Sequence, residues 1–149
     1  MDKTKKYQDL QTQLHSLILP SDNIISKMAN FSRMYWEAFE FHWVGFYIVD
    51  SEKQELYLGP FQGPTACTQI LKGKGVCGTS WSEAKTLIVD DVHKFPGHIA
   101  CSALSKSEIV VPVIKERTVV AVLDIDSDEF SSFDKFDQKY LETFLNDLF

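Results

Sequence analysis

The residues best able to do chemistry in this sequence are three cysteines, Cys67, Cys77 and Cys101. Each lies beside glycine, proline, serine or threonine residues, whereas structural cysteines usually lie inside apolar segments. We therefore expect all three in loops or at loop ends, within reach of solvent or a ligand. A thiol there can attack an electrophile, form a disulfide or bind a metal, and an inert core thiol is the alternative for each.

A zinc site is one use of these thiols. The segment from His98 to Cys101 contains two possible zinc ligands, with His93, Cys67 and Cys77 upstream. The sequence has no C-x-x-C pair, although structural zinc sites usually draw their ligands in pairs from tight turns. We therefore predict no metal site and no cofactor.

Two aspartates form a second group with chemical potential. Asp124 and Asp126 alternate onto one face of an expected strand, beyond Val120 and Val122. They could mark the point where the strand reaches solvent. If they are enclosed, they need a positive group such as an ammonium between them, because close carboxylates resist joint ionisation.

Glu108 opens the preceding expected strand and is a candidate third carboxylate. A plain two-residue turn at 116–117 would pair it with Ile125 and place it on the wrong face. Proline inside a strand indicates an edge or a bulge, and one extra residue near Pro112 would bring Glu108 opposite Asp126.

Two aromatic residues complete the candidate site. Trp43 and Tyr47 alternate onto one face of an expected strand, with Gly45 between them. We expect open space between two aromatic walls, although ordinary core packing would explain each ring equally well.

Hydrophobic spacing predicts the elements that must position these groups. We expect a polar helix up to about Leu19, a break at Pro20, and a second helix that Asp22 caps. The second helix has an apolar stripe of Ile24, Met28, Phe31, Tyr35 and Ala38. The expected strands are 43–49, 55–58, 86–89, 109–114 and 118–126.

Irregular segments and a last helix account for the rest of the chain. Residues 59–78 contain five glycines and two prolines, which predicts a long loop before a short helix over 79–85. A second loop is expected over 94–101. The last helix, capped by Ser132, has an apolar stripe of Phe133, Phe136, Tyr140, Phe144 and Leu148. Helices at both ends of a run of strands predict a single α+β domain over residues 1–149, with a mostly antiparallel sheet.

Composition and charge exclude several classes of function. The net charge of −6 and the scattered lysines and arginines do not suit nucleic acid or an anionic membrane. No apolar run approaches the roughly 20 residues of a membrane span, and the N-terminus has no signal-peptide core, so we expect a cytoplasmic protein. Residues 73–78 fit the G-x-G-x-x-G pattern, but the surrounding sequence does not suit dinucleotide binding. We interpret these glycines as allowing a sharp turn and a close backbone approach.

Six segments that contain all three cysteines resemble the free methionine-(R)-sulfoxide reductases, a family with a GAF-type fold. The segments are Trp43–Tyr47, Leu58–Cys67, Gly75–Thr79, Gly97–Cys101, Ser107–Val110 and Val122–Ser127. The resemblance implies an antiparallel sheet with helices packed behind it and a substrate cavity closed by the two cysteine loops. It also implies a homodimer through the terminal helices.

The resemblance further implies a role for each thiol. Cys101 would attack the sulfoxide sulfur of free methionine-R-sulfoxide, leaving methionine and a sulfenic acid. Cys67 would be the main partner that converts the sulfenic acid into a disulfide, with Cys77 as a secondary partner. A thioredoxin-like reductant would then restore the thiols.

The remaining candidate residues would bind the substrate. By the same resemblance, Glu108, Asp124 and Asp126 anchor its ammonium group and orient or protonate the sulfoxide oxygen. Trp43 and Tyr47 would surround its methyl-sulfinyl end. Two other functions compete with this one, namely a GAF module that senses a small molecule without catalysis and a zinc-stabilised interaction domain.

Overall fold

The computed structural model describes residues 2–99 and 101–149, so Ala100 in the expected loop 94–101 lies outside the described residues. The helices are α1 (Lys3–Leu17), α2 (Ile24–Phe39), α3 (Gly75–Glu83), the 3-10 turn η1 (Val92–Lys94) and α4 (Lys135–Leu148). The strands are β1 (Trp43–Asp50), β2 (Glu55–Gln62), β3 (Gln69–Leu71), β4 (Leu87–Val89), β5 (Ser107–Lys115) and β6 (Thr118–Ser127).

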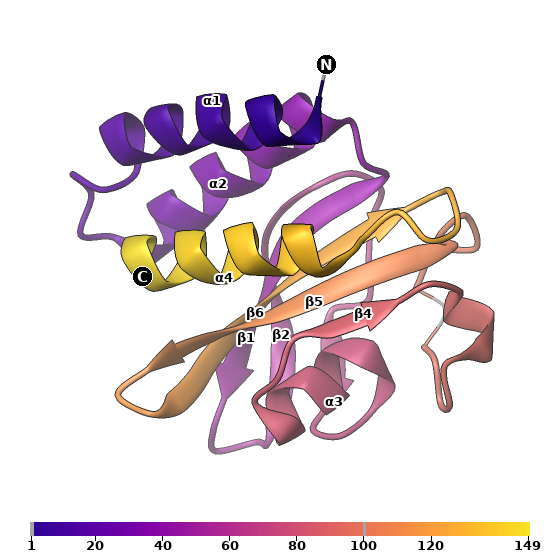
Figure 1. The fold of residues 1–149 in the computed structure, drawn as a ribbon. Helices are drawn as coiled ribbons and strands as arrows, with labels where there is room; N and C mark the ends of the chain where they lie inside the picture. Colours follow the sequence, from indigo (N-terminus) through magenta and orange to yellow (C-terminus); the bar gives the residue numbers. More distant parts are fainter. Residues whose placement is uncertain (1, 100) are drawn as a thin grey trace.

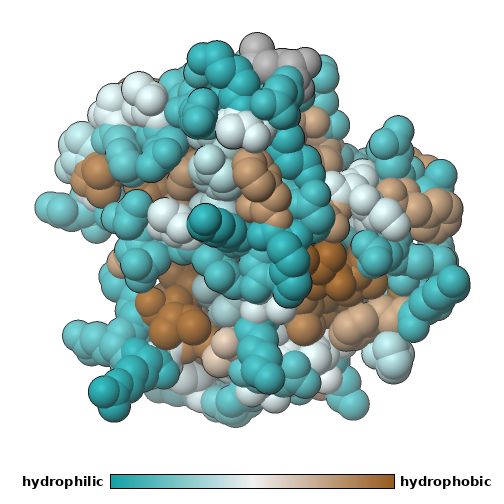
Figure 2. Space-filling model, in the orientation of Figure 1, coloured by the Kyte–Doolittle hydropathy of each residue, from teal (hydrophilic) through white to brown (hydrophobic). Residues whose placement is uncertain are grey.

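The strands form one antiparallel sheet in the order β3-β2-β1-β6-β5-β4. Helices α1, α2 and α4 lie on one face of this sheet, and α3 lies on the other (Figure 1). This arrangement confirms the predicted α+β class. The face shown in Figure 2 is mostly hydrophilic, with hydrophobic groups in separate small areas. Across the described residues, every helix is too short or too polar to cross a bilayer.

The helical face contains the larger hydrophobic core, and the predicted apolar stripes contribute to it. Met28, Phe31 and Tyr35 of α2 and Phe144 and Leu148 of α4 are buried there. The predicted caps were wrong by one or two residues. Asn23, not Asp22, caps α2, and Asp134, not Ser132, caps α4 because it forms a reciprocal capping box with Asp137.

A buried polar network holds the N-terminal helix on this core. The Tyr7 hydroxyl donates to Asp137 Oδ1 at 2.7 Å and lies 2.6 Å from the Tyr35 hydroxyl. Lys3 Nζ donates to Asp137 Oδ2 at 2.8 Å, and the Asp134 backbone N–H donates to the same oxygen at 2.9 Å. One fully buried carboxylate therefore joins α1, α2 and α4.

Replacing Asp137 with alanine is expected to lower the free energy of unfolding by about 3 kcal/mol, because the change removes a fully buried carboxylate that accepts hydrogen bonds from the Tyr7 hydroxyl and the Asp134 backbone N–H. Thermal unfolding should show this as a Tm lower by roughly 6 to 12 °C. Asp9→Ala removes only the exposed ion pair of Asp9 with Lys5 and is the matched control, with an expected loss below about 1 kcal/mol. Equal losses in the two variants would contradict this account.

The other face of the sheet differs from the prediction in one segment. Residues 59–78 are not one long loop, since β2 continues to Gln62, β3 follows, and α3 begins at Gly75. A Cβ at Gly78 would lie 2.5 Å from the Leu71 carbonyl oxygen, so glycine is required for this close packing. The predicted close backbone approach is thereby confirmed, and the positive φ angles of Gly73 and Gly75, 77° and 62°, confirm the predicted sharp turn. The prediction missed that the helix already begins at Gly75.

The β5–β6 hairpin has the register that a bulge was expected to create. Glu116 and Arg117 form the turn with positive φ angles of 51° and 66°, and Glu108 pairs with Asp126. The register shift lies between Val113 and Ile114, so the extra residue is Val120 on β6, not a residue at Pro112. Val120 consequently packs with the helical core, whereas the prediction placed it on the face of Asp124.

Candidate functional site

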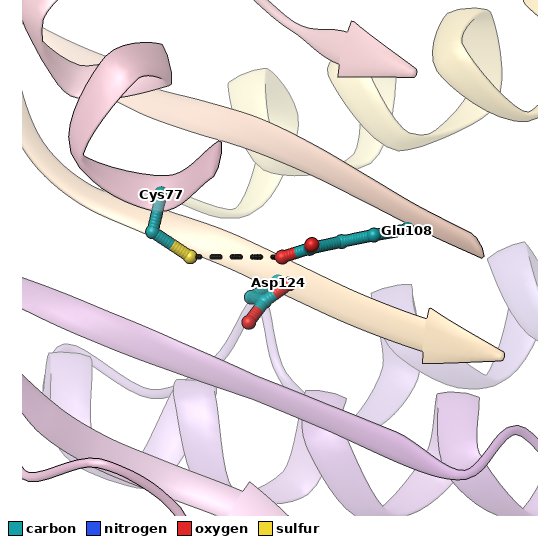
Figure 3. A group of neighbouring side chains, drawn as sticks. All are labelled: Cys77, Glu108 and Asp124. Carbon is teal, nitrogen blue, oxygen red and sulfur yellow. Dashed lines mark hydrogen bonds between the residues drawn. The ribbon is translucent and has the colours of Figure 1, made fainter. Parts of the chain in front are cut away.

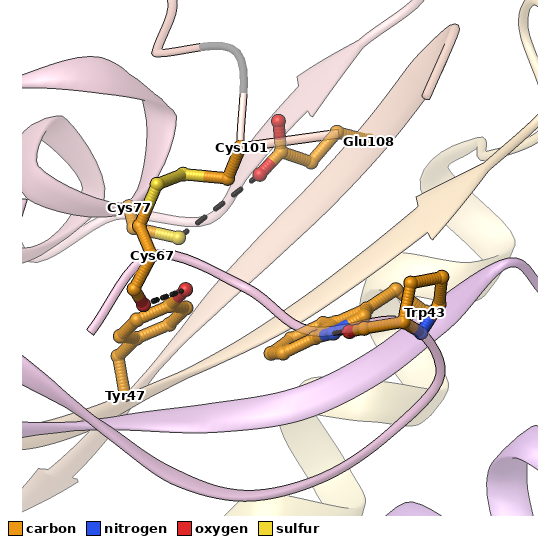
Figure 4. Close-up of a disulfide and its surroundings, with 7 residues drawn as sticks. Trp43, Tyr47, Cys67, Cys77, Cys101 and Glu108 are labelled. Carbon is orange, nitrogen blue, oxygen red and sulfur yellow. Dashed lines mark hydrogen bonds between the residues drawn. A yellow bond between two sulfur atoms is a disulfide. The ribbon is translucent and has the colours of Figure 1, made fainter. Parts of the chain in front are cut away.

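The two cysteine loops meet at a disulfide between Cys67 and Cys101, whose Cα atoms lie 5.5 Å apart (Figure 4). Cys67 follows β2, and Cys101 lies in the segment before β5. Both residues are partly exposed. Neither sulfur can serve as a zinc thiolate while this bond is present, which weighs against the zinc site first considered.

Side chains at the start of β1 fasten both cysteine loops. The Tyr47 hydroxyl donates to the carbonyl oxygen of Cys67 at 2.9 Å, and Trp43 Nε1 donates to the carbonyl oxygen of Pro64 at 3.0 Å. On the other loop, Ser102 Oγ lies 2.9 Å from His42 Nε2. Sequence analysis missed His42 and Ser102, although each is adjacent to a residue it did select.

The space expected at Gly45 is filled. The Trp43 and Tyr47 rings stack with their centroids 5.9 Å apart, and Phe61 stacks on Trp43 at 5.2 Å. A Cβ at Gly45 would lie 2.4 Å from Phe61 Cβ and 2.6 Å from the Trp43 ring. The prediction of open space was therefore wrong, because the large indole side chain folds over the glycine. Phe61 is a further member of this wall that the sequence did not reveal.

Cys77 was expected in or beside a loop but lies within α3 and is buried. Its Sγ points toward Glu108 and lies 4.0 Å from Glu108 Oε1 (Figure 3). Burial, together with the carboxyls of Asp124 and Glu108, raises the pKa of the Cys77 thiol well above its ordinary value. Cys77 is therefore a protonated thiol at neutral pH in this structure.

The three predicted carboxylates lie together at adjacent positions of β5 and β6. Glu108 and Asp124 are only 5% and 6% exposed, and Asp126 is partly buried. Burial raises the pKa of all three, and mutual repulsion raises those of Glu108 and Asp126 further. Asp124 Oδ1 has no hydrogen-bond partner. None of the ion pairs within the described residues includes any of the three. The low exposure of Glu108 and Asp124 therefore excludes a solvent-exposed strand end.

A cavity of about 50 Å³ brings the predicted groups together. The predicted residues that line it are Trp43, Tyr47, Cys77, Cys101, Glu108, Asp124 and Asp126. Cys67 is not among the lining residues, but its neighbour Ala66 is. Lys74 and His98 also line the cavity, and sequence analysis did not assign them to a substrate site.

Comparisons with known proteins agree with this arrangement. Residues 32–148 match the GAF domain family. GAF domain-containing protein A of Dictyostelium discoideum is 55% identical over 96% of this chain and 90% of that protein. The free methionine-R-sulfoxide reductase of Escherichia coli K12 is 40% identical over 95% of this chain and 85% of that protein. An X-ray structure of free methionine-R-sulfoxide reductase from Neisseria meningitidis in complex with its substrate matches with a TM-score of 0.97. It is 43% identical and the match covers 99% of this chain and 89% of that one.

Proposed function

The chain belongs to the free methionine-R-sulfoxide reductases of the GAF domain family, and on that premise we propose that it reduces free L-methionine-R-sulfoxide to methionine. The observation that carries the proposal is the Cys67–Cys101 disulfide at a cavity whose wall holds three carboxyls that form no ion pair within the described residues. A disulfide supports redox chemistry at this place. The acidic cluster supports a substrate with a positively charged group.

The first chemical step belongs to Cys101. Its thiolate attacks the sulfoxide sulfur and forms a sulfur–sulfur bond to the substrate, while the sulfur–oxygen bond breaks and the oxygen takes up two protons and leaves as water. Water then attacks the Cys101 sulfur, breaks the sulfur–sulfur bond, releases methionine and loses one proton. The products are methionine and a sulfenic acid on Cys101, so the thiol is oxidised by two electrons and the sulfoxide is reduced by two. Glu108, Asp124 and Asp126 anchor the ammonium group and orient or protonate the sulfoxide oxygen. Their raised pKa values favour carboxyl groups that can donate a hydrogen bond to that oxygen.

The second step forms the disulfide. The Cys67 thiolate attacks the sulfenic sulfur of Cys101 and releases water. The Cα distance of 5.5 Å supports this pairing because disulfides require Cα atoms within about 7 Å. Cys77 is a secondary partner for the same sulfenic acid. A thioredoxin-like dithiol then reduces the disulfide and restores both thiols. The protein also forms a homodimer through its terminal helices.

The direct test mixes reduced protein with free methionine-R-sulfoxide in a single turnover. We expect one methionine per chain and one new disulfide between Cys67 and Cys101, measured by amino-acid analysis and peptide mapping. Methionine-S-sulfoxide is the control substrate and should give neither product. A protein that binds the R-sulfoxide without reducing it would favour the sensing GAF module instead.

Cys67→Ser is expected to separate the two steps. The variant retains the attacking thiol, so it should release about one equivalent of methionine in a single turnover. It should lose most multiple turnover with thioredoxin, because the main partner for the sulfenic acid is gone. Methionine release is measured with and without thioredoxin. A wild-type rate of multiple turnover would show that Cys67 is not the main partner of Cys101.

A further inference from the structure

A thiol and two carboxyls from three different elements converge in the wall of the cavity. Cys77 comes from α3, Glu108 from β5 and Asp124 from β6 (Figure 3). One ligand atom of each lies within 4.8 Å of the others. All three side chains are more than nine-tenths buried. The cluster is therefore a buried group of three possible metal ligands and not a chance grouping of exposed acidic residues.

A second observation indicates that this cluster can bind a cation. Asp124 Oδ1 is buried without any hydrogen-bond partner, although buried polar atoms almost always have one. Two buried carboxyls without a positive group are costly in their ionised form. The presence of a thiol in the same cluster narrows the choice of cation. Thiolate ligands favour zinc and related soft ions, whereas magnesium and calcium favour sites made of oxygen atoms alone.

We propose that Cys77, Glu108 and Asp124 form a binding site for a thiophilic divalent cation, with Zn²⁺ as the natural ion and Cd²⁺ as its probe. Zinc–sulfur bonds of about 2.3 Å and zinc–oxygen bonds of about 2.1 Å require ligand atoms roughly 3.5 Å apart. The 4.0 Å between Cys77 Sγ and Glu108 Oε1 is close to that spacing. Binding releases the thiol proton to solvent, and the fourth position of the ion faces the cavity.

This site differs from the zinc site that sequence analysis considered. It uses neither His93 nor His98, and it leaves Cys67 and Cys101 free to form their disulfide. The site is therefore complete in the oxidised protein. If the proposed function holds, an ion here occupies the acidic cluster that the ammonium group of the substrate needs. Metal and substrate then exclude each other, so the metal acts as an inhibitor that does not touch the attacking thiol.

The experiment titrates the oxidised full-length protein with Cd²⁺ and records the absorption of the metal–thiolate bond. We expect saturation at one Cd²⁺ per chain, displacement by Zn²⁺ and no response to Mg²⁺. Cys77→Ser should lose the band. Glu108→Gln should weaken binding by more than about 100-fold, since loss of outer partners alone costs about 10- to 100-fold. The variant with both Cys67→Ser and Cys101→Ser should keep the band, because its only thiol is Cys77.

The outcomes separate this proposal from the proposed function. No band in the oxidised wild-type protein, or an unchanged band in Cys77→Ser, would overturn the metal site, whatever the protein does with a sulfoxide. Competition is tested in the double serine variant, which cannot react. Free methionine-R-sulfoxide should weaken its Cd²⁺ binding, and unchanged binding would overturn the mutual exclusion. Turnover plays no part in either readout.

Discussion

Cys101→Ser is expected to abolish turnover of free methionine-R-sulfoxide while leaving the fold intact. A hydroxyl is a far weaker nucleophile than a thiolate at neutral pH, so the first step cannot begin. The measurement is methionine release over both single and multiple turnovers, with circular dichroism as the check on folding. Cys77→Ser is the matched control, since it removes a different thiol of the same cavity and should retain single-turnover release. Methionine production by Cys101→Ser at the wild-type rate would end the role assigned to this residue.

The second large effect concerns the substrate. A free amino acid is expected to react several orders of magnitude more efficiently than its N-acetylated form or a peptide that contains the sulfoxide. Glu108 and Asp124 are buried and form no ion pair within the described residues, and of the three compounds only the free amino acid brings an ammonium group to them. A site with buried polar groups rejects an analogue that leaves them unpaired. The cavity volume of about 50 Å³ also leaves little room for a flanking chain.

A competition assay with the three compounds measures this selectivity. Comparable kcat/KM values for all three would contradict the role of the acidic cluster. Asp124→Ala should lower kcat/KM for the free amino acid but should not change the rate at which Cys101 in the reduced protein reacts with a general thiol reagent. If the variant keeps full efficiency, Asp124 does not bind the substrate.

The strands could be predicted because their apolar alternation is strong, and the same alternation placed Asp124 and Asp126 on one face. The last residues of β2 could not be predicted from the sequence, because Gly59 and Pro60 suggest a loop. Proline is tolerated there since the pairing of β2 with β3 covers only Glu55–Tyr57 and does not reach Pro60. The start of α3 was missed for a similar reason, since glycine weakens a helix locally while its close packing on Leu71 is a tertiary effect.

The candidate site shows the same division. Cysteines, carboxyls and aromatic residues could be selected by type and spacing, and the structure brings seven of the eight to one cavity. Phe61 and His42 could not be selected, because their roles depend on contacts across β1 and with the loop after Cys101. The spacing of residues in a strand predicts the face on which each side chain lies. It does not predict which side chain from another segment packs against that face.

The bulge at Val120 constrains how this hairpin can change in evolution. Glu108 lies opposite Asp126 because one unpaired residue on β6 compensates for a two-residue turn at Glu116 and Arg117. A single insertion or deletion in the turn would move every side chain of one strand to the opposite face of the sheet. Only a second insertion or deletion that adds or removes a bulge would restore the original faces. The length of the turn and the number of bulges must therefore change together. Insertions or deletions at this turn should be tolerated in compensating combinations rather than alone.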